Sequence, residues 1–222
     1  MLNGIKGVIF DLDGTLVDSM WIWPQVDHDY MEKYGLKKPM DMECLIEGKG
    51  CNEIADMFLT WFSTLNKTRT EIVSEWMDMT YDKYVNDVTL KKGAKEFIYE
   101  LSSAGVMLGI ASSNAKELIH ATLDSLNVRQ YFSSIHSADE VKHGKPSPEV
   151  YLKVLEDFGI PSKNCLVFED IPMGILAGKN AGMKVCAVED SFSANLKHKK
   201  EELADFYIES YDDIKHGTYK IL

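Results

Sequence analysis

The hydrophobic pattern near the start of the chain predicts a short buried strand. Residues 8–10 are Val, Ile and Phe, a β-favouring apolar run that stops at Asp11. A continuous run of this kind is typical of a parallel strand that is covered on both faces. We therefore place this strand inside a sheet, with its carboxyl end at Asp11.

From about residue 90 onward, apolar runs of strand type alternate with segments of helical periodicity. We expect helices over residues 94–101, 115–126, 148–158 and 174–181, and strands over residues 106–111, 165–168, 184–188 and 206–208, the last at a sheet edge. Strands that are separated by helices imply right-handed crossovers and a parallel, doubly wound sheet. The first strand belongs to the same sheet.

The stretch between these regions carries only helical patterns. Apolar positions recur at helical spacing over residues 23–34, 54–65 and 72–77, and no convincing strand lies between Asp18 and Val88. All four tryptophans and seven of the eleven methionines fall here, as expected of a small helical bundle whose methionines either pack its core or line an adaptable apolar pocket. The sequence therefore predicts an α/β fold: a Rossmann-like core over residues 1–17 and 90–222, with an all-helical domain inserted over residues 18–89.

Composition limits the partners of the protein. A formal net charge of −11 over 222 residues disfavours nucleic acid and anionic membranes, because both attract a basic surface. A small phosphorylated metabolite is compatible with this net charge, since such a ligand needs only a local cation.

The cysteines form no CxxC pair, and Cys165 and Cys186 lie in apolar runs typical of buried thiols. With no signal-peptide pattern and no apolar run of about 18–20 residues, we expect a cytoplasmic, soluble monomer.

Two carboxylates, Asp11 and Asp13, follow the first strand directly. Carboxylates at the end of a buried strand cost free energy unless an ion or a reaction uses them, although a capped turn is the simpler interpretation. Gly14 permits the chain to turn sharply there. Because open α/β sheets bind ligands outside the carboxyl ends of their strands, we interpret Asp11 and Asp13 as catalytic groups.

Two other segments carry polar residues in comparable positions. Ser112, Ser113 and Asn114 follow a predicted strand and precede a helix, where hydroxyl and amide groups either bind a phosphate or simply cap the helix. Lys145 lies between a glycine and a proline in the turn before another helix. An ammonium group fixed in such a turn is suited to balance a phosphate and a carboxylate.

A second acidic pair, Glu169 and Asp170, ends the predicted strand over residues 165–168. If that strand lies beside the first, these two carboxylates converge with Asp11 and Asp13, and the four repel one another. A hard divalent cation with oxygen ligands removes the repulsion, and Mg²⁺ is the usual ion where phosphate shares the site. The pattern therefore predicts a magnesium site.

Together these residues resemble the haloacid dehalogenase-like superfamily of aspartate-nucleophile phosphatases. The segments that match its motifs, in order, are DLDGT over residues 11–15, the strand end at Ser112, Lys145, the pair Glu169 and Asp170, and then Gly174 with residues 177–183. The resemblance covers essentially the whole chain. It implies that the helical insertion is a cap over the active site, as in the branch that contains sugar-phosphate phosphatases, phosphoglycolate phosphatases and β-phosphoglucomutase.

The resemblance also implies a role for each motif residue. Asp11 would attack phosphorus to form an aspartyl-phosphate, and Asp13 would protonate the leaving oxygen and then activate water. Ser112 and Lys145 would hold the phosphoryl oxygens. Dehalogenases of the superfamily usually lack the second aspartate, so Asp13 favours phosphoryl transfer.

The same resemblance implies a set of metal ligands and a set of substrate-binding residues. The metal ligands would be Asp11, the main-chain carbonyl of Asp13, Asp170 and, directly or through water, Glu169. The substrate-binding residues would be Leu12, Ser113, Asn114 and Lys49. Lys49 lies in the loop over residues 47–52 between cap helices, which in this superfamily can select the substrate; it either meets a second anion or is a solvated surface lysine.

Departures from the family pattern keep two other functions open. Ile171 stands where many relatives have a serine. A mutase would need a histidine in the first cap helix and an arginine in a cap loop, and Trp23 and Cys51 stand near those positions. A non-catalytic phosphate-binding regulatory domain would have lost at least one motif residue, and all of them are present. We therefore expect a magnesium-dependent phosphatase of a small phosphorylated metabolite.

Overall fold

The first strand lies at the centre of a seven-stranded sheet. The computed structural model describes residues 1–46 and 49–222, and it orders the strands β5-β4-β1-β6-β7-β8-β9. Their bounds are β1 (Gly7–Phe10), β4 (Met107–Ser112), β5 (Ser134–Ser137), β6 (Cys165–Glu169), β7 (Lys184–Val188), β8 (Phe206–Ile208) and β9 (Lys220–Ile221). All neighbouring pairs are parallel except β8 and β9.

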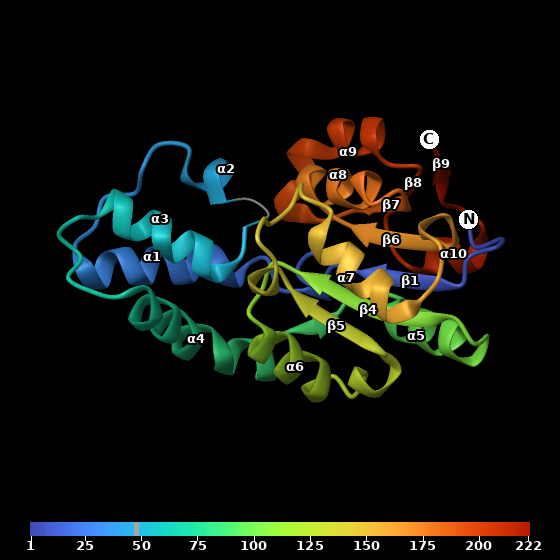
Figure 1. Cartoon of the computed structure of the whole chain (residues 1–222), viewed down its shortest axis with the longest axis horizontal. Helices are drawn as coiled ribbons and strands as arrows, with labels where there is room; N and C mark the ends of the chain where they lie inside the picture. Colours follow the sequence, from blue (N-terminus) through green and yellow to red (C-terminus); the bar gives the residue numbers. More distant parts are fainter. Residues whose placement is uncertain (47–48) are drawn as a thin grey trace.

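Helices cover both faces of this sheet, so its central strands are apolar on both sides. Side chains of β1 alternate: Val8 and Phe10 pack into one hydrophobic cluster and Ile9 into the other. Helices α5 (Ala94–Ser103), α6 (Lys116–Ser125) and α10 (Asp212–His216) cover the Phe10 face, and α7 (Glu149–Phe158), α8 (Pro172–Asn180) and α9 (Lys197–Leu203) cover the Ile9 face (Figure 1). Short 3₁₀ helices span Arg129–Tyr131, Ala138–Glu140, Ser162–Asn164 and Ser191–Leu196.

In its described residues the cap consists of four helices, and it lies at one end of the molecule (Figure 1). They are α1 (Ile22–Tyr34), α2 (Met42–Ile46), α3 (Cys51–Trp61) and α4 (Arg69–Asn86). Gly35, with φ at 61°, ends α1 in the left-handed conformation, and Thr68 begins α4 with a reciprocal capping box. The interior is aromatic: the ring of Phe58 lies 4.9 Å from that of Trp76 and 6.1 Å from that of Tyr30.

Helix α4 of the cap packs against α6 of the core, and cap and core also meet where the chain passes between them and at the start of α3. The strands β2 (Val17–Asp18) and β3 (Thr89–Leu90) pair antiparallel where the chain enters and leaves the cap. At the start of α3, the backbone N–H of Asn52 donates to Asp139 Oδ1 of the core at 3.1 Å. The cap boundaries that we predict stay a prediction, and they coincide with these paired strands.

The structure confirms the doubly wound α/β fold and the predicted helices. The ends of the core helices differ from the prediction by at most two residues, whereas in the cap the patterns over residues 54–65 and 72–77 belong to the helices Cys51–Trp61 and Arg69–Asn86. It also confirms that Cys165 and Cys186 are buried thiols. The sequence pattern missed β5, whose residues Ser134–Ser137 include only one apolar side chain because the strand lies at a sheet edge. The expectation that residues 206–208 form an edge strand is wrong, because β9 pairs outside them. No helix of the described residues is long and apolar enough to span a bilayer.

One cap carboxylate gives a prediction about stability. Burial raises the pKa of Asp27 on α1 to about 6, although Lys38 opposes the effect. The folded cap therefore holds this proton more tightly than the unfolded chain does, and stability is lost as the pH rises from about 4 to 6. We expect Asp27→Asn to raise the free energy of unfolding by about 1.5 kcal/mol at pH 5 and by up to about 3 kcal/mol at pH 8.

Urea unfolding at the two pH values measures this difference. Asp29→Asn, at an exposed position of the same helix, is the matched control and should have the same small effect at both. An equal gain from Asp27→Asn at pH 5 and pH 8 would contradict the expectation.

Candidate active site

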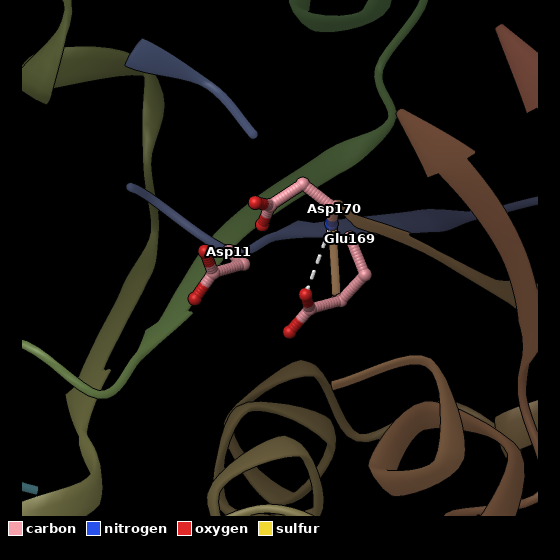
Figure 2. Close-up of side chains that lie close together, drawn as sticks. All are labelled: Asp11, Glu169 and Asp170. Carbon is pink, nitrogen blue, oxygen red and sulfur yellow. Dashed lines mark hydrogen bonds between the residues drawn. The ribbon is translucent and has the colours of Figure 1, made fainter. Parts of the chain in front are cut away.

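The sheet order brings three polar strand ends together. β1 pairs with β4 on one side and with β6 on the other, so that Phe10 lies opposite Ile110 and Phe168. Asp11, Ser112 and Glu169 consequently end neighbouring strands at the same edge of the sheet. Figure 2 shows Asp11, Glu169 and Asp170 close together at that edge. One carboxylate oxygen from each lies within 4.8 Å of those from the other two.

Lys145 joins two of these carboxylates. Its Nζ donates to Asp11 Oδ1 at 2.6 Å and to Glu169 Oε1 at 2.5 Å, and the lysine is only 4% exposed. Burial alone would lower the pKa of Lys145, but the charges of Asp11 and Glu169 outweigh burial and raise it. Burial raises the pKa of Asp11 to about 8, against the effect of Lys145. The ammonium group is thereby fixed beside Asp11, at the place where we expect a phosphoryl group.

Both oxygens of Glu169 already have protein partners. Oε1 accepts from Lys145 and also from the Tyr151 hydroxyl at 2.6 Å, and Oε2 accepts from the backbone N–H of Asp170 at 3.1 Å. Figure 2 shows the Glu169 carboxylate turned back toward that N–H, marked by the dashed line. A Cβ at Gly174 would collide with this carboxylate, so the space beside Glu169 requires glycine. Glu169 therefore orients Lys145 and the start of the following loop.

The two carboxylate oxygens of Asp170 differ in their hydrogen bonding. Thr15 Oγ1 donates to Oδ1 at 2.9 Å, whereas Oδ2 is buried and has no hydrogen-bond partner among the described residues. Burial and the charges of Glu169 and Asp11 raise the pKa of Asp170 well above its ordinary value. If ionised, the three carboxylates and the one ammonium group leave a formal charge of −2. An unpaired buried carboxylate oxygen in an all-oxygen, doubly negative cluster fits a hard divalent cation.

The fourth carboxylate, Asp13, lies beside this cluster with separate partners. Its Oδ1 accepts from Ser19 Oγ at 2.5 Å and from the Tyr84 hydroxyl at 2.6 Å, and its Oδ2 accepts from Asn114 Nδ2 at 3.0 Å. The expectation that four carboxylates converge therefore needs correction, because three donors hold the side chain of Asp13 apart. Burial raises the pKa of Asp13, and these hydrogen bonds oppose the rise.

The predicted phosphate-binding residues lie around Asp11 and Asp13. Ser112 is buried at the end of β4, and its Oγ accepts from the backbone N–H of Asn114 at 3.0 Å. Asn114 Oδ1 accepts from the backbone N–H of Ala115 at 2.8 Å. Ala115 is the N-cap residue of α6, and no described side chain caps this helix, so the helix-capping interpretation of this segment is wrong and phosphate binding stays a prediction. Ser113 follows Ser112 at the half-exposed rim.

The structure gives less direct support to the predicted substrate-binding roles of Leu12 and Lys49. The side chain of Leu12 is fully buried in the hydrophobic core, so only its main chain can reach a ligand. Lys49 forms an ion pair with Glu53 on the first turn of α3, and its predicted contact with a second anion stays a prediction. Glu47 and Gly48, which belong to the same predicted specificity loop, lie outside the described residues.

Sequence reasoning missed four side chains that position the site: Thr15, Ser19, Tyr84 and Tyr151. Thr15 belongs to the DLDGT segment, but its bond to Asp170 spans 155 residues. Tyr84 and Tyr151 lie on the buried faces of α4 and α7 among apolar residues. Their spacing signals burial alone, so helical periodicity could not distinguish them from ordinary core residues.

Comparison with known proteins places this site in a family. The model of the haloacid dehalogenase-like hydrolases matches residues 8–188. The chain is 30% identical over 222 residues to (DL)-glycerol-3-phosphatase 2 of Arabidopsis thaliana, covering 96% of this chain and 90% of that one. It is also 30% identical over 187 residues to hexitol phosphatase A of Escherichia coli, covering 82% of each.

Comparison with solved structures supports the same fold. The structure of β-phosphoglucomutase from Clostridium difficile superimposes with a TM-score of 0.80 at 22% identity, covering 96% of this chain and 95% of that one. At this identity the likeness bears on the fold alone. The family match extends from the first strand through β7 and so includes every motif described above. This chain belongs to the haloacid dehalogenase-like hydrolase family.

Proposed function

We propose that this protein is a magnesium-dependent phosphatase that hydrolyses a small phosphorylated metabolite through an aspartyl-phosphate intermediate. One observation carries the proposal: Asp11 is held at a strand end by the buried ammonium of Lys145, next to an unpaired oxygen of Asp170. A carboxylate can act as a nucleophile toward phosphorus and form an aspartyl-phosphate. The phosphatase names of the relatives that are 30% identical support the reaction class.

The chain's own residues divide the reaction between them. A carboxylate oxygen of Asp11 forms a bond to phosphorus while the bond from phosphorus to the leaving oxygen breaks, and that oxygen takes the proton of Asp13. Asp13, now ionised, accepts a proton from water as the water attacks the aspartyl-phosphate. The bond from phosphorus to Asp11 then breaks, which releases phosphate. Lys145 and the strand end at Ser112 stabilise the transferring phosphoryl oxygens.

Asp11, Asp170 and the main-chain carbonyl of Asp13 would hold the cation, with Glu169 acting directly or through water. Mg²⁺ bound there would neutralise charge on the phosphoryl group and keep Asp11 ionised. The hydrogen bonds of Glu169 to Lys145, Tyr151 and the Asp170 N–H favour the water-mediated role, since both of its oxygens are already occupied. We keep the cytoplasmic location and the monomeric state as predictions that accompany this proposal.

A phosphosugar mutase remains the second candidate. Such an enzyme must bind a second phosphate under its cap, and the residues near the expected positions are Trp23 and Cys51. The Trp23 ring packs against Tyr84 at 6.1 Å, and Cys51 is buried. Neither side chain carries a positive charge, so the hydrolase is favoured.

Phosphate release from a panel of monoesters tests the reaction class and its metal requirement. The panel contains glycerol 3-phosphate, hexitol phosphates, phosphoglycolate, a nucleotide and β-glucose 1-phosphate. We expect release from a few members with Mg²⁺, loss of release with a chelator, and recovery when Mg²⁺ is returned in excess. Chelator-resistant release would contradict the metal requirement, and conversion of β-glucose 1-phosphate to the 6-phosphate without release would favour the mutase.

Replacement of the nucleophile tests the covalent intermediate. Asp11→Asn keeps the shape of the side chain and removes the attacking carboxylate, so turnover should fall by more than about 10⁴-fold. Rapid acid quenching with labelled substrate should trap phosphate on the unchanged protein and none on the variant. Asp124→Asn, which removes only an exposed ion pair with Arg129, should leave both signals intact. Retained turnover in Asp11→Asn would exclude Asp11 as the nucleophile.

A further inference from the structure

A hydroxyl from the cap reaches the predicted acid–base residue of the core. Tyr84 lies near the end of α4, is fully buried, and donates to Asp13 Oδ1 at 2.6 Å across 71 residues of sequence. The edge of the Trp23 ring packs against the Tyr84 ring, with centroids 6.1 Å apart. Tyr84 is therefore held from the cap side by packing and from the core side by a hydrogen bond.

The two oxygens of Asp13 are not equivalent. Oδ1 accepts from two hydroxyls, Tyr84 at 2.6 Å and Ser19 at 2.5 Å, whereas within the described part of the chain Oδ2 accepts from Asn114 Nδ2 alone, at 3.0 Å. Two short O–H donors occupy Oδ1 and fix the carboxyl plane. A proton carried by Asp13 therefore has its place on Oδ2.

Both hydroxyls lie near the connections between cap and core, Tyr84 on the cap helix α4. Ser19 follows β2 directly, and Tyr84 lies five residues before β3, the strand that pairs with β2. Asp13 itself forms an isolated bridge with Val17 of β2. A rotation of the cap about these paired strands would move the Tyr84 hydroxyl relative to Asp13, so the three-donor arrangement requires the cap to lie on the core.

We propose that Tyr84 is a positioning residue that orients Asp13 when the cap is closed, so that Oδ2 delivers the proton to the leaving oxygen. This inference rests on the proposed phosphatase activity. It makes cap closure a condition for leaving-group protonation, because the donor that fixes Asp13 belongs to the cap. Tyr84 differs in this bond from Tyr30, whose hydroxyl is equally buried in the cap and has no hydrogen-bond partner among the residues that the structure describes.

The test compares two leaving groups in Tyr84→Phe, which keeps the ring and its packing on Trp23. An alkyl phosphate needs a proton on its leaving oxygen, whereas p-nitrophenyl phosphate leaves without one. Because kcat/KM reports the steps up to departure of the leaving group, we expect it to fall by about 10–100-fold for the alkyl ester. For p-nitrophenyl phosphate it should change by less than about threefold. Asp13→Asn should show the same split with a larger amplitude.

Two further variants test whether a change in the ratio of the two kcat/KM values is specific to the hydroxyl donors of Asp13 Oδ1. Tyr30→Phe removes an equally buried cap hydroxyl and should leave the ratio of the two kcat/KM values unchanged. Ser19→Ala removes the second donor to Oδ1 and should shift the ratio in the direction of Tyr84→Phe; it also tests the anchoring of Oδ1 if Tyr84→Phe fails to fold.

The outcomes separate this inference from the proposed function. An active parent protein whose Tyr84→Phe variant keeps the parent ratio, or loses both activities equally, overturns the inference alone. If Tyr84→Phe fails to fold, an unchanged ratio in Ser19→Ala overturns it. A parent protein that releases phosphate from none of the esters overturns the proposed function and the inference with it.

Discussion

The site depends on the burial of several carboxylates around a single ammonium group. Taking Asp11, Glu169 and Asp170 out of water costs several kcal/mol per ion, and their mutual repulsion adds to that cost. Lys145 offsets part of it through ion pairs of 2.6 and 2.5 Å with Asp11 and Glu169. A divalent cation would neutralise the remaining negative charge and would also attract the negative oxygens of a phosphoryl group, so the charge imbalance makes this cluster suited to hold a cation.

The core and the cap position different parts of the candidate site. Core elements position the part of the site around Asp11: the turn at Lys145, Tyr151 on α7 and the close approach of α8 at Gly174 all fix Glu169. Asp13, two residues after Asp11, instead receives donors from the cap and its connections as well as from Asn114. The short DLDGT segment thus links a part of the site that the core positions to a part that also contacts the cap.

The sequence predicted the fold where hydrophobic periodicity was strong. The apolar run before Asp11, the stripe on α1 and the strand over residues 184–188 were all correct, because burial on one or both faces dictates these patterns. The sequence pattern did not predict the edge strands β5 and β9, because a strand at a partly covered sheet edge needs few apolar side chains. Their positions depend on which strands pair in the sheet, and the local sequence pattern does not determine this pairing.

The sequence by itself determined which residue types carry the chemistry and their order along the chain, because each motif residue follows a recognisable strand end or turn. Only the tertiary structure decided how they are used. It turned both oxygens of Glu169 toward protein donors, left Asp170 Oδ2 unpaired, and brought the Tyr84 hydroxyl to Asp13. The physical reason is that the Glu169–Lys145 and Tyr84–Asp13 contacts join residues 24 and 71 positions apart, and a side chain's hydrogen-bond partner depends on packing that spacing along a helix or strand does not specify.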